Sequence, residues 1–367
     1  MPNTFLTPSI IANEALMVLQ NNLVMADLVH RDYSDEFQRV GDTITVRKPA
    51  TFTARNFTGE VTAQDVTEGS ATVKLDHFRD VSVKVTSKEM TLDIRNFSEQ
   101  IIAPAMSALA QAVDSDLIAE GIFGAGTSVT ATASPTDLKD IAQLGKAFDA
   151  AAVPQQLRRL VLGVDHKYNY VTVDNLSKVA YAGDNAALRD ATIGKVYSFD
   201  TFLSQNCPNT AAATAGTATA AKLTATAGEA KVALSGLSAA TATIKTGDGF
   251  IIDGRCYRFI ADGTGASSAI ESIAIDQPFH RTISTAETIY LVRAAHSLAF
   301  HRNGIALVTR PLELPAGAGK AAIASANGLG VRVVYDYNAT TKTDMVSFDI
   351  LYGVKVLDSK MVARLVG

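Results

Sequence analysis

The sequence predicts an α+β protein with an inserted, small β-barrel-like domain, and three observations lead to this fold class. Apolar residues recur at spacings of three and four near the N-terminus and again over residues 97–120, which is the period of a helix. Residues 43–86 and 330–366 alternate polar and apolar side chains, as half-buried strands do. Residues 206–295 contain short strand-like runs next to Asp–Gly pairs, which are typical of tight turns.

The first helix is predicted over residues 9–29. Leu16, Leu19, Leu23 and Ala26 form one apolar stripe along it. A charged run follows directly, so the helix has little core of its own nearby in the sequence. We therefore expect it to dock on another part of the chain or on a neighbouring molecule.

Residues 43–86 are expected to form a long two-stranded hairpin. Its strands are predicted at Thr43–Val46 and Val81–Val85, where polar and apolar residues alternate. Pro49–Ser70 between them is Thr-rich and charged, with too few apolar residues for a core. Because an isolated hairpin is marginally stable in water, this arm is expected to lie against another surface.

The clearest helix is predicted over residues 97–120. Its apolar face comprises Ile102, Met106, Leu109, Val113 and Leu117. Pro104 is expected in the first turn or at a kink, because a proline inside a helix costs ~3 kcal/mol.

The centre of the chain alternates helix and strand character. The predicted elements are a helix at Asp137–Ala151, a strand at Leu160–Val164, a helix at His166–Val179 and a strand or hairpin at Lys195–Leu203. An Ala- and Thr-rich stretch then breaks the composition at residues 208–245, and such a stretch can be a flexible linker. Because short strand patterns follow it, we interpret residues 206–295 as an inserted β domain to which this stretch contributes the first strands and loops.

Composition and motifs exclude several classes of function. The 367 residues include 33 Lys and Arg and 37 Asp and Glu, a net charge of −4, so the chain is not a broadly basic nucleic-acid binder. Cys207 and Cys256 lack CxxC spacing, and the six histidines form no HExxH pattern, so we expect no metal, cofactor or disulfide framework. The first residues lack the pattern of a secretory signal, and no run approaches ~18 apolar residues, so we expect no membrane association.

The order of these segments resembles the major capsid (coat) proteins of tailed bacteriophages, which have the Hong Kong 97 type of shell fold. The similarity is to the short-tailed podophage branch, whose coat proteins carry an inserted β domain. The stretches that carry the resemblance are NEALMVLQNNLVMADLVHRDYSDEF at 13–37, GDTITVRKP at 41–49, LAFHRNGIALVTRPL at 298–312 and VSFDILYGVKVLDSKMVARLVG at 346–367. None is a catalytic fingerprint, so the specificity lies in their order.

The resemblance implies a phage major capsid fold with five parts. These are an N-terminal arm at 1–40, an extended β-arm or E-loop at 41–87, a peripheral domain with a spine helix at 88–125 and 300–367, an axial domain at 126–205 with some of 296–300, and the inserted β domain at 206–295.

The resemblance also implies a structural role rather than an enzymatic one. The chain would self-assemble into hexamers and pentamers of an icosahedral shell that encloses double-stranded DNA, which it would contact nonspecifically. Implied partners are copies of itself, a scaffolding protein, a portal and, as a further candidate, a decoration protein. The expected locations are the virion capsid and, during assembly, the host cytoplasm.

Five charged residues of the predicted β-arm are candidates for contacts between subunits. Arg47, Lys48 and Arg79 could pair with acidic groups of a neighbour, with Glu60 and Asp80 as reciprocal partners. The alternative is a solvated charged arm, since charge runs commonly serve solubility.

Two histidine-containing pairs admit a chemical and a structural interpretation. Asp165–His166 could be the acid/base pair of a hydrolase, but no GxSxG motif accompanies it, which favours a strand end and helix start with Asp165 as the N-cap. His301–Arg302 could contact a phosphate, but one basic pair gives little specific binding, which favours a strand residue at a domain junction.

Two further motifs favour turns over ligand sites. Asp248, Asp253 and Asp262 could suggest calcium, but each precedes a glycine and the DxDxDG order is missing, so turn chemistry is favoured. PAGAGK at 315–320 is not a phosphate-binding loop, because Ala321 stands where that motif needs Ser or Thr.

Three alternatives to a phage coat protein are open. A nanocompartment shell protein of the same fold is disfavoured by the podophage-like insertion. A carbohydrate-binding or tail-associated β protein is weakened by the absence of Trp and by an aromatic content of 7%. An enzyme would depend on Asp165–His166 alone.

Overall fold

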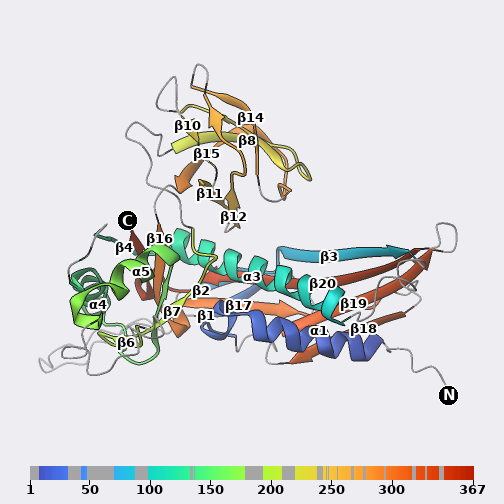
Figure 1. Ribbon diagram of the computed structural model, residues 1–367, viewed down its shortest axis with the longest axis horizontal. Helices are drawn as coiled ribbons and strands as arrows, with labels where there is room; N and C mark the ends of the chain where they lie inside the picture. The colour runs from blue at the N-terminus through green and yellow to red at the C-terminus, as the bar shows by residue number, and fades with distance from the viewer. Residues whose placement is uncertain are drawn as a thin grey trace, which may run out of the picture. The chain divides into compact units, whose positions relative to one another are not determined.

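The computed structural model describes most of the chain and divides it into two compact units (Figure 1). The described residues are 8–31, 43–47, 70–86, 98–132, 135, 137–177, 193–208, 220–237, 243–244, 246, 248–253, 255–265, 268–275, 278–292, 295–315, 320–326, 329–338 and 343–367. The first unit comprises Met1–Asn22, His30–Ala110 and Ala306–Leu357, and the second comprises Leu23–Val29, Gln111–Ile305 and Asp358–Gly367. Both units combine helices with sheets, which confirms the predicted α+β class.

A five-stranded sheet forms the centre of the first unit. Along one path its strands follow the order β17-β20-β19-β18. The fifth strand, β3, pairs antiparallel with residues 343–352 of β20. The strands are β3 (His77–Thr86), β17 (Ile305–Arg310), β18 (Lys320–Ala326), β19 (Leu329–Asn338) and β20 (Thr343–Val356). Val333 of β19 lies opposite Phe348 of β20, so their side chains point to the same face of the sheet. Both side chains are fully buried, so this face belongs to the core.

The N-terminal helix α1 (Pro8–Asn22) packs on β18 and β19 of this sheet (Figure 1). Leu16 and Leu19 of the predicted stripe are buried, so the helix docks within its own chain. It ends at Asn22 rather than at residue 29 and is followed by the short 3-10 helix η1 (Met25–Asp27).

The long helix begins with a π-helical turn, η3 (Ser98–Ile102), and continues as α3 (Ala103–Gly124). Pro104 is the second residue of α3 and directly follows the π-helical turn, so it lies in the first turn of α3, at the junction with η3, rather than in the first turn of the long helix. The predicted apolar face is buried along its length. Gln100–Gly124 is apolar and long enough to cross a membrane, but 61% of its most apolar window is buried inside the protein, as in the core helix of a globular domain.

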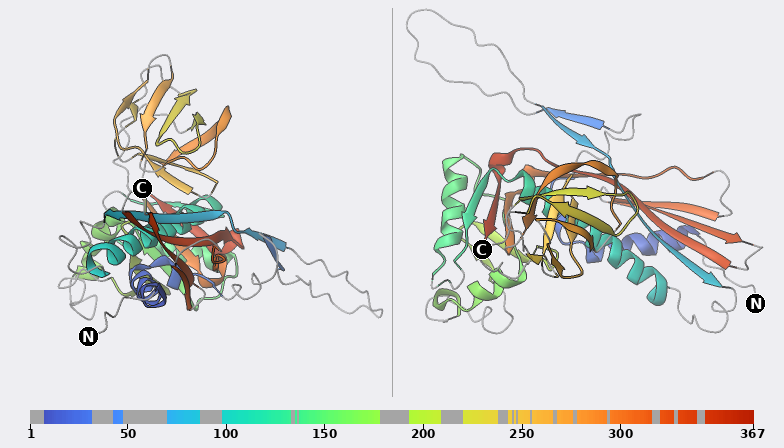
Figure 2. Two further views of the ribbon diagram at one scale, coloured as in Figure 1. Left: turned by 90° about the vertical axis from the view of Figure 1, so that its right-hand side faces the viewer. Right: turned by 90° about the horizontal axis from the view of Figure 1, so that it is seen from above.

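The predicted hairpin of residues 43–86 has a different pairing. β1 (Thr43–Arg47) pairs with β2 (Ser70–Lys74), and Figure 2 shows this two-stranded ribbon clearly. The prediction that Val81–Val85 forms its second strand is wrong, because that run lies in β3 and pairs with β20. The reason is burial: in β3, Val85 is buried and the His77 ring stacks on Tyr352 at 5.1 Å.

A six-stranded sheet forms the core of the second unit, in the order β4-β21-β16-β5-β7-β6. Its strands are β4 (Thr127–Thr130), β5 (Arg158–Leu162), β6 (Lys195–Val196), β7 (Phe199–Leu203), β16 (His296–His301) and β21 (Val362–Val366). The helices of this region are α4 (Lys139–Ala150), α5 (Val164–Val171) and α6 (Asp174–Ser177). Ile141, Leu144 and Phe148 of α4 are buried, which confirms the helix predicted at Asp137–Ala151, and the pairing of β6 with β7 confirms the hairpin. The predicted strand is present as β5 but ends at Leu162, and the helix predicted at His166–Val179 is instead two short helices, α5 and α6.

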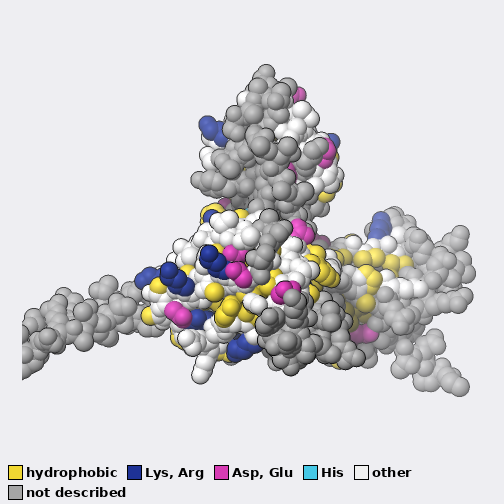
Figure 3. Space-filling view, turned by 60° about the vertical axis from the view of Figure 1, so that its left-hand side comes forward, with side chains coloured by type: hydrophobic (Ala, Val, Ile, Leu, Met, Phe, Trp, Pro, Cys, Tyr) yellow, Lys and Arg dark blue, Asp and Glu magenta, His cyan; other side chains and the backbone are white. Residues whose placement is uncertain are grey.

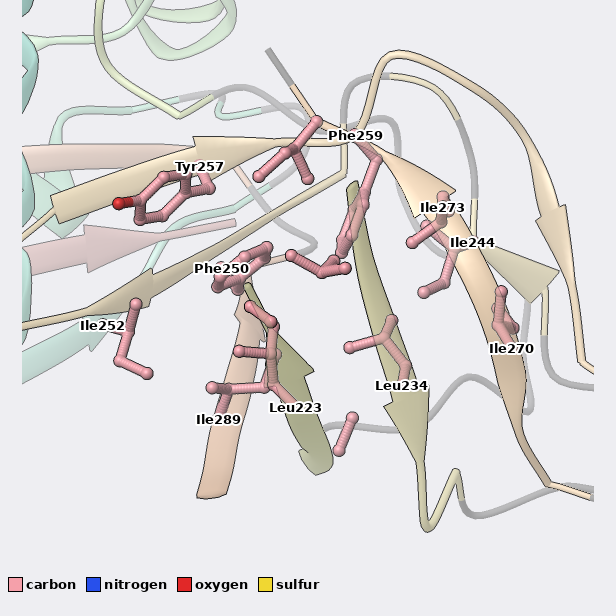
Figure 4. Close-up of a cluster of buried hydrophobic side chains, with 14 of the residues drawn as sticks. Leu223, Leu234, Ile244, Phe250, Ile252, Tyr257, Phe259, Ile270, Ile273 and Ile289 are labelled. Carbon is pink, nitrogen blue, oxygen red and sulfur yellow. The ribbon is translucent and has the colours of Figure 1, made fainter. Parts of the chain in front are cut away.

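Residues 220–292 contain a second six-stranded sheet, ordered β12-β11-β15-β8-β9-β14. Its strands are β8 (Ala220–Ala225), β9 (Lys231–Ser235), β11 (Gly249–Ile252), β12 (Arg255–Arg258), β14 (Ile270–Ala274) and β15 (Ile283–Val292), beside a two-stranded pair of β10 (Thr243–Ile244) and β13 (Gly263–Thr264). A bridge between Phe259 and Ile275 joins the two edges, as in a small barrel. Figure 4 shows the apolar side chains that fill the interior, including Leu223, Phe250 and Ile289.

The two ends of this β region meet. The His296 N–H donates to the carbonyl of Pro208 at 2.9 Å, so the chain leaves and re-enters the second unit's core at one place. The Ala- and Thr-rich stretch supplies β8 and β9, and its residues 209–219 lie outside the described residues.

Candidate functional site

The predicted arm is anchored at its base by a small apolar cluster. Val73 and Leu75 are buried together with Val308, and Leu351 and Leu357 pack against them. This cluster fixes the point from which the β1–β2 ribbon extends. Residues 48–69, which include the predicted tip, lie outside the described residues.

Gly353 of β20 allows the arm to cross the sheet closely. A Cβ atom at this position would lie 2.2 Å from the carbonyl oxygen of Lys74. No side-chain atom can approach a backbone oxygen so closely, so only glycine fits here without moving the backbone.

Of the five predicted contact residues, the structure describes three, and it places Arg47 on a different sheet from Arg79 and Asp80. Arg47 ends β1 opposite Ser70, and Lys48 and Glu60 lie outside the described residues. Arg79 and Asp80 lie in β3, on the edge of the five-stranded sheet rather than on the ribbon. Their part in contacts between subunits stays a prediction.

Asp80 belongs to a polar chain across three strands. The Ser82 Oγ lies 3.1 Å from the Asp80 carboxylate and 3.0 Å from the Ser347 Oγ, which donates to Asp349 at 2.7 Å. Arg332 donates twice to Asp349 from β19, at 2.9 and 2.6 Å. Because this guanidinium compensates its charge, Asp349 can be buried in the sheet.

Asp165 and His166 form a structural junction rather than an acid/base pair. His166 is buried, and its Nδ1 lies 2.7 Å from the Ser297 Oγ, which accepts the Gly163 N–H at 2.9 Å. Burial, together with the nearby His296, lowers the pKa of His166 to about 4. The imidazole is therefore neutral at physiological pH and ties the start of α5 to β16.

The prediction that Asp165 is the N-cap of this helix is wrong. Gly163 is the N-cap, and exposed Asp165 lies in the first turn of α5. The strand ends at Leu162, so the helix begins earlier than the apolar run suggests.

His301 has the strand-end role that the structural interpretation predicts. It is the last residue of β16, and its Nδ1 accepts the Asn303 N–H at 3.2 Å, which caps the 3-10 helix η4 (Arg302–Gly304). Burial lowers the pKa of its imidazole.

The three aspartates of the inserted region have separate partners. The backbone carbonyl of Asp248 accepts the Phe259 N–H, and Asp262 accepts from the N–H and hydroxyl of Thr246 at 2.8 and 2.9 Å. Asp253 binds His280 and Arg281 instead. Over the described ranges, no three His, Cys, Asp or Glu side chains form a group that could hold a metal ion.

Asp253 is the centre of a network that the sequence did not indicate. Arg281 donates to Asp253 at 2.6 Å and binds Glu287 with two hydrogen bonds, at 2.9 and 2.7 Å. His280 lies 3.0 Å from Asp253 and 2.6 Å from the Tyr257 hydroxyl. Burial raises the pKa of Asp253, but the bonds from Arg281 and His280 outweigh it and lower that pKa overall.

Asp114 of α3 is a second residue without a sequence signal of its own. It is buried and accepts the N–H groups of Val24 at 3.0 Å and Met25 at 3.1 Å, so it caps the start of η1 from a distant helix. Burial raises its pKa to about 6, against the lowering effect of these backbone hydrogen bonds.

Comparison with known proteins identifies a family. The family model described as "P22 coat protein - gene protein 5" matches residues 4–260, which is more than half of the chain. No curated protein sequence matches the chain.

Solved structures share the fold at low sequence identity. A chain of Mycobacterium phage Che8 is similar with a TM-score of 0.56 and 15% identity, over 94% of this chain and 90% of that chain. A chain from the capsid structure of the Cyanophage P-SCSP1u is similar with a TM-score of 0.52 and 12% identity, over 89% of this chain and 84% of that chain. At these identities the likeness shows the fold alone.

Proposed function

Because this chain belongs to the P22 coat protein family, and so is a structural major capsid protein of a phage shell rather than an enzyme, we propose that its copies assemble as hexamers and pentamers of an icosahedral shell around double-stranded DNA. The observation that carries this proposal is the anchored arm. The β1–β2 ribbon has its apolar cluster at the base, and the residues between its strands are poor in apolar side chains. Such an arm gains stability by lying on a neighbouring copy.

The parts of the chain have different roles in this proposal. Residues 41–87 provide the clasp, and residues 126–205 with some of 296–300 form the axial domain around the centre of each capsomer. Helix α1 packs on its own sheet, so the clasp depends on the arm more than on this helix. Residues 206–295 form the inserted domain. Contacts of this head-to-tail kind close into rings when the rotation between copies permits it.

The proposed partners follow from the same role. They are a scaffolding protein during assembly in the host cytoplasm, a portal, a decoration protein and the packaged DNA. A net charge of −4 supports nonspecific DNA contact rather than sequence reading.

The proposal is tested by producing the full chain with and without a candidate scaffolding protein. Sedimentation and negative-stain microscopy should reveal uniform shells or capsomers. A chain that stays monomeric with every scaffold and under crowding would contradict the proposal.

A further inference from the structure

An open groove of about 580 Å³ lies in the second unit, between α4 and the β6–β7 turn. Ala142, Gly145 and Lys146 of α4 line one wall, and Tyr197 and Ser198 line the other. Among the strands that the structure describes, β6 is also an edge strand of the six-stranded sheet. The groove is thus built from two elements of one rigid core.

Arg158 holds the floor of this groove in place. Its side chain is 1% exposed and donates to Asp149 of α4 at 2.6 Å and to the carbonyl of Pro154 at 2.9 Å. It also lies 3.4 Å from the Ser198 hydroxyl and stacks over the Phe148 ring at 5.6 Å. One buried cation therefore connects the helix, the loop before β5 and the β6–β7 turn. A groove fixed in this way loses little conformational freedom on binding.

Residues with a positive φ are concentrated in two loops beside the groove, the loop between α4 and β5 and the turn between β6 and β7. Six non-glycine residues in the described ranges have a positive φ, and four of them are in these loops. They are Ala152 (φ 55°), Leu157 (φ 59°), Tyr197 (φ 44°) and Ser198 (φ 72°). Tyr197 and Ser198 are the two central residues of the β6–β7 hairpin, whose tight turn needs a positive φ at both positions. A residue other than glycine in this region of φ costs on the order of 1 kcal/mol.

The same loops expose large apolar side chains. Leu157 is 46% exposed and Tyr197 is 55% exposed. A glycine at position 197 would relieve the strain, yet the chain has a tyrosine there, one of the residue types enriched among the anchors of protein interfaces.

We propose that this groove and Tyr197 form a contact surface for a second copy of this chain. The inference rests on the proposed function, since a shell-building subunit must bury surface against its own copies, and it assigns the contact to specific residues of the proposed axial domain. The charges beside the groove favour a protein over DNA. Lys146 and Lys195 lie there with Asp149 and Asp200, so cations and carboxylates balance and the surface has no excess of positive charge to attract phosphates. On the face shown in Figure 3, basic and acidic side chains are likewise interspersed.

Three variants of the full chain test this surface in the shell-assembly assay. Tyr197→Gly removes the anchor and relieves strain, so its melting temperature should equal or exceed that of the wild type. Ala142→Arg fills the groove from an exposed helix position, and Gln143→Arg adds the same side chain at the next exposed position, outside the groove, as the matched control. The subunit concentration needed for assembly should rise at least tenfold for the first two variants, as for loss of an interface anchor, and stay unchanged for Gln143→Arg.

Cross-linking identifies the occupant of the groove. A photo-cross-linking phenylalanine derivative at position 197 should yield a product with a second copy of the chain when shells form. Normal assembly of Tyr197→Gly and Ala142→Arg would overturn the inference, as would cross-links to scaffold or DNA alone. If the wild type never assembles, the proposed function fails instead. If Ala142→Arg misfolds, Tyr197→Gly decides the question.

Discussion

At the residue scale, Asp114 combines burial with hydrogen bonds to two backbone amides. Its pKa in the folded protein is about 6, against an ordinary value of 3.8. The folded state therefore binds this proton more tightly than the unfolded state, and stability rises as the pH falls through 6 toward 4. The pKa difference corresponds to a free energy on the order of 3 kcal/mol.

Asp114→Asn should remove this titration. The wild type should gain stability between pH 7 and pH 5, and the variant should gain less, because the amide does not ionise. Thermal unfolding at a series of pH values measures the difference. Gln143→Asn, at an exposed position of α4 and without a change in any ionisable group, is the control and should keep the wild-type slope. An unchanged slope in Asp114→Asn would contradict the assignment.

Arg281 is the second residue whose replacement should be informative. Arg281→Lys loses the paired hydrogen bonds to Glu287, because an ammonium group cannot match both carboxylate oxygens. Since both side chains are partly exposed and the pair is screened by solvent, the expected loss of stability is small.

Hydrogen exchange locates the effect of Arg281→Lys. Faster exchange is expected in β11 and β15 and not in the five-stranded sheet. Arg364→Lys, whose Nε donates to Ser128 at 3.3 Å, is the matched control. Equal exchange in all regions would show that the network does not stabilise the inserted region.

At the element scale, local periodicity predicted the helices well and the strand partners less well. The stripe of α1 and the buried face of α4 both follow from spacings within one segment. A period of two shows which face of a strand is buried but not which strand is its neighbour. The sequence therefore predicts that Val81–Val85 joins the hairpin, whereas in the structure this run pairs with β20. The Arg281 network was missed for a related reason, because Asp253 lies 28 residues away.

Gly353 should be essential for the anchor of the arm. In Gly353→Ala the new methyl group meets the Lys74 carbonyl oxygen, so β2 or β20 must move. The expected loss of stability is about 1–3 kcal/mol, as for overpacked sites. Chemical denaturation measures it.

Gly145→Ala in α4 is the matched control for this change. Its methyl group would meet only the Phe199 ring, at 3.8 Å, which is an ordinary contact. An alanine should stabilise the helix there by up to about 1 kcal/mol. If Gly353→Ala is as stable as Gly145→Ala, the close crossing is not required.

At the scale of the whole molecule, the family is that of a shell subunit, and the roles of the polar side chains explain why the sequence shows no functional site. The polar clusters hold strands and helices together: His166 ties α5 to β16, and Arg332 compensates Asp349. Contacts with other copies depend on exposed surfaces and extended segments, which leave no spacing motif. The proposed contact groove beside Tyr197 is such a surface, because its two walls are separated by roughly fifty residues of sequence.

Deletion of residues 50–70 tests the arm as a whole. The apolar cluster of Val73, Leu75 and Val308 lies outside the deletion, so the chain should fold as a soluble monomer with a nearly unchanged melting temperature. Shells should be absent by sedimentation and negative-stain microscopy, because the clasp on the neighbouring copy is lost. A variant with residues 50–70 replaced by a Gly/Ser segment of equal length separates reach from sequence, and it should also fail if the arm's side chains make the contact. Normal shells from the deletion variant would show that the arm is not the clasp and would transfer that role to the groove and Tyr197.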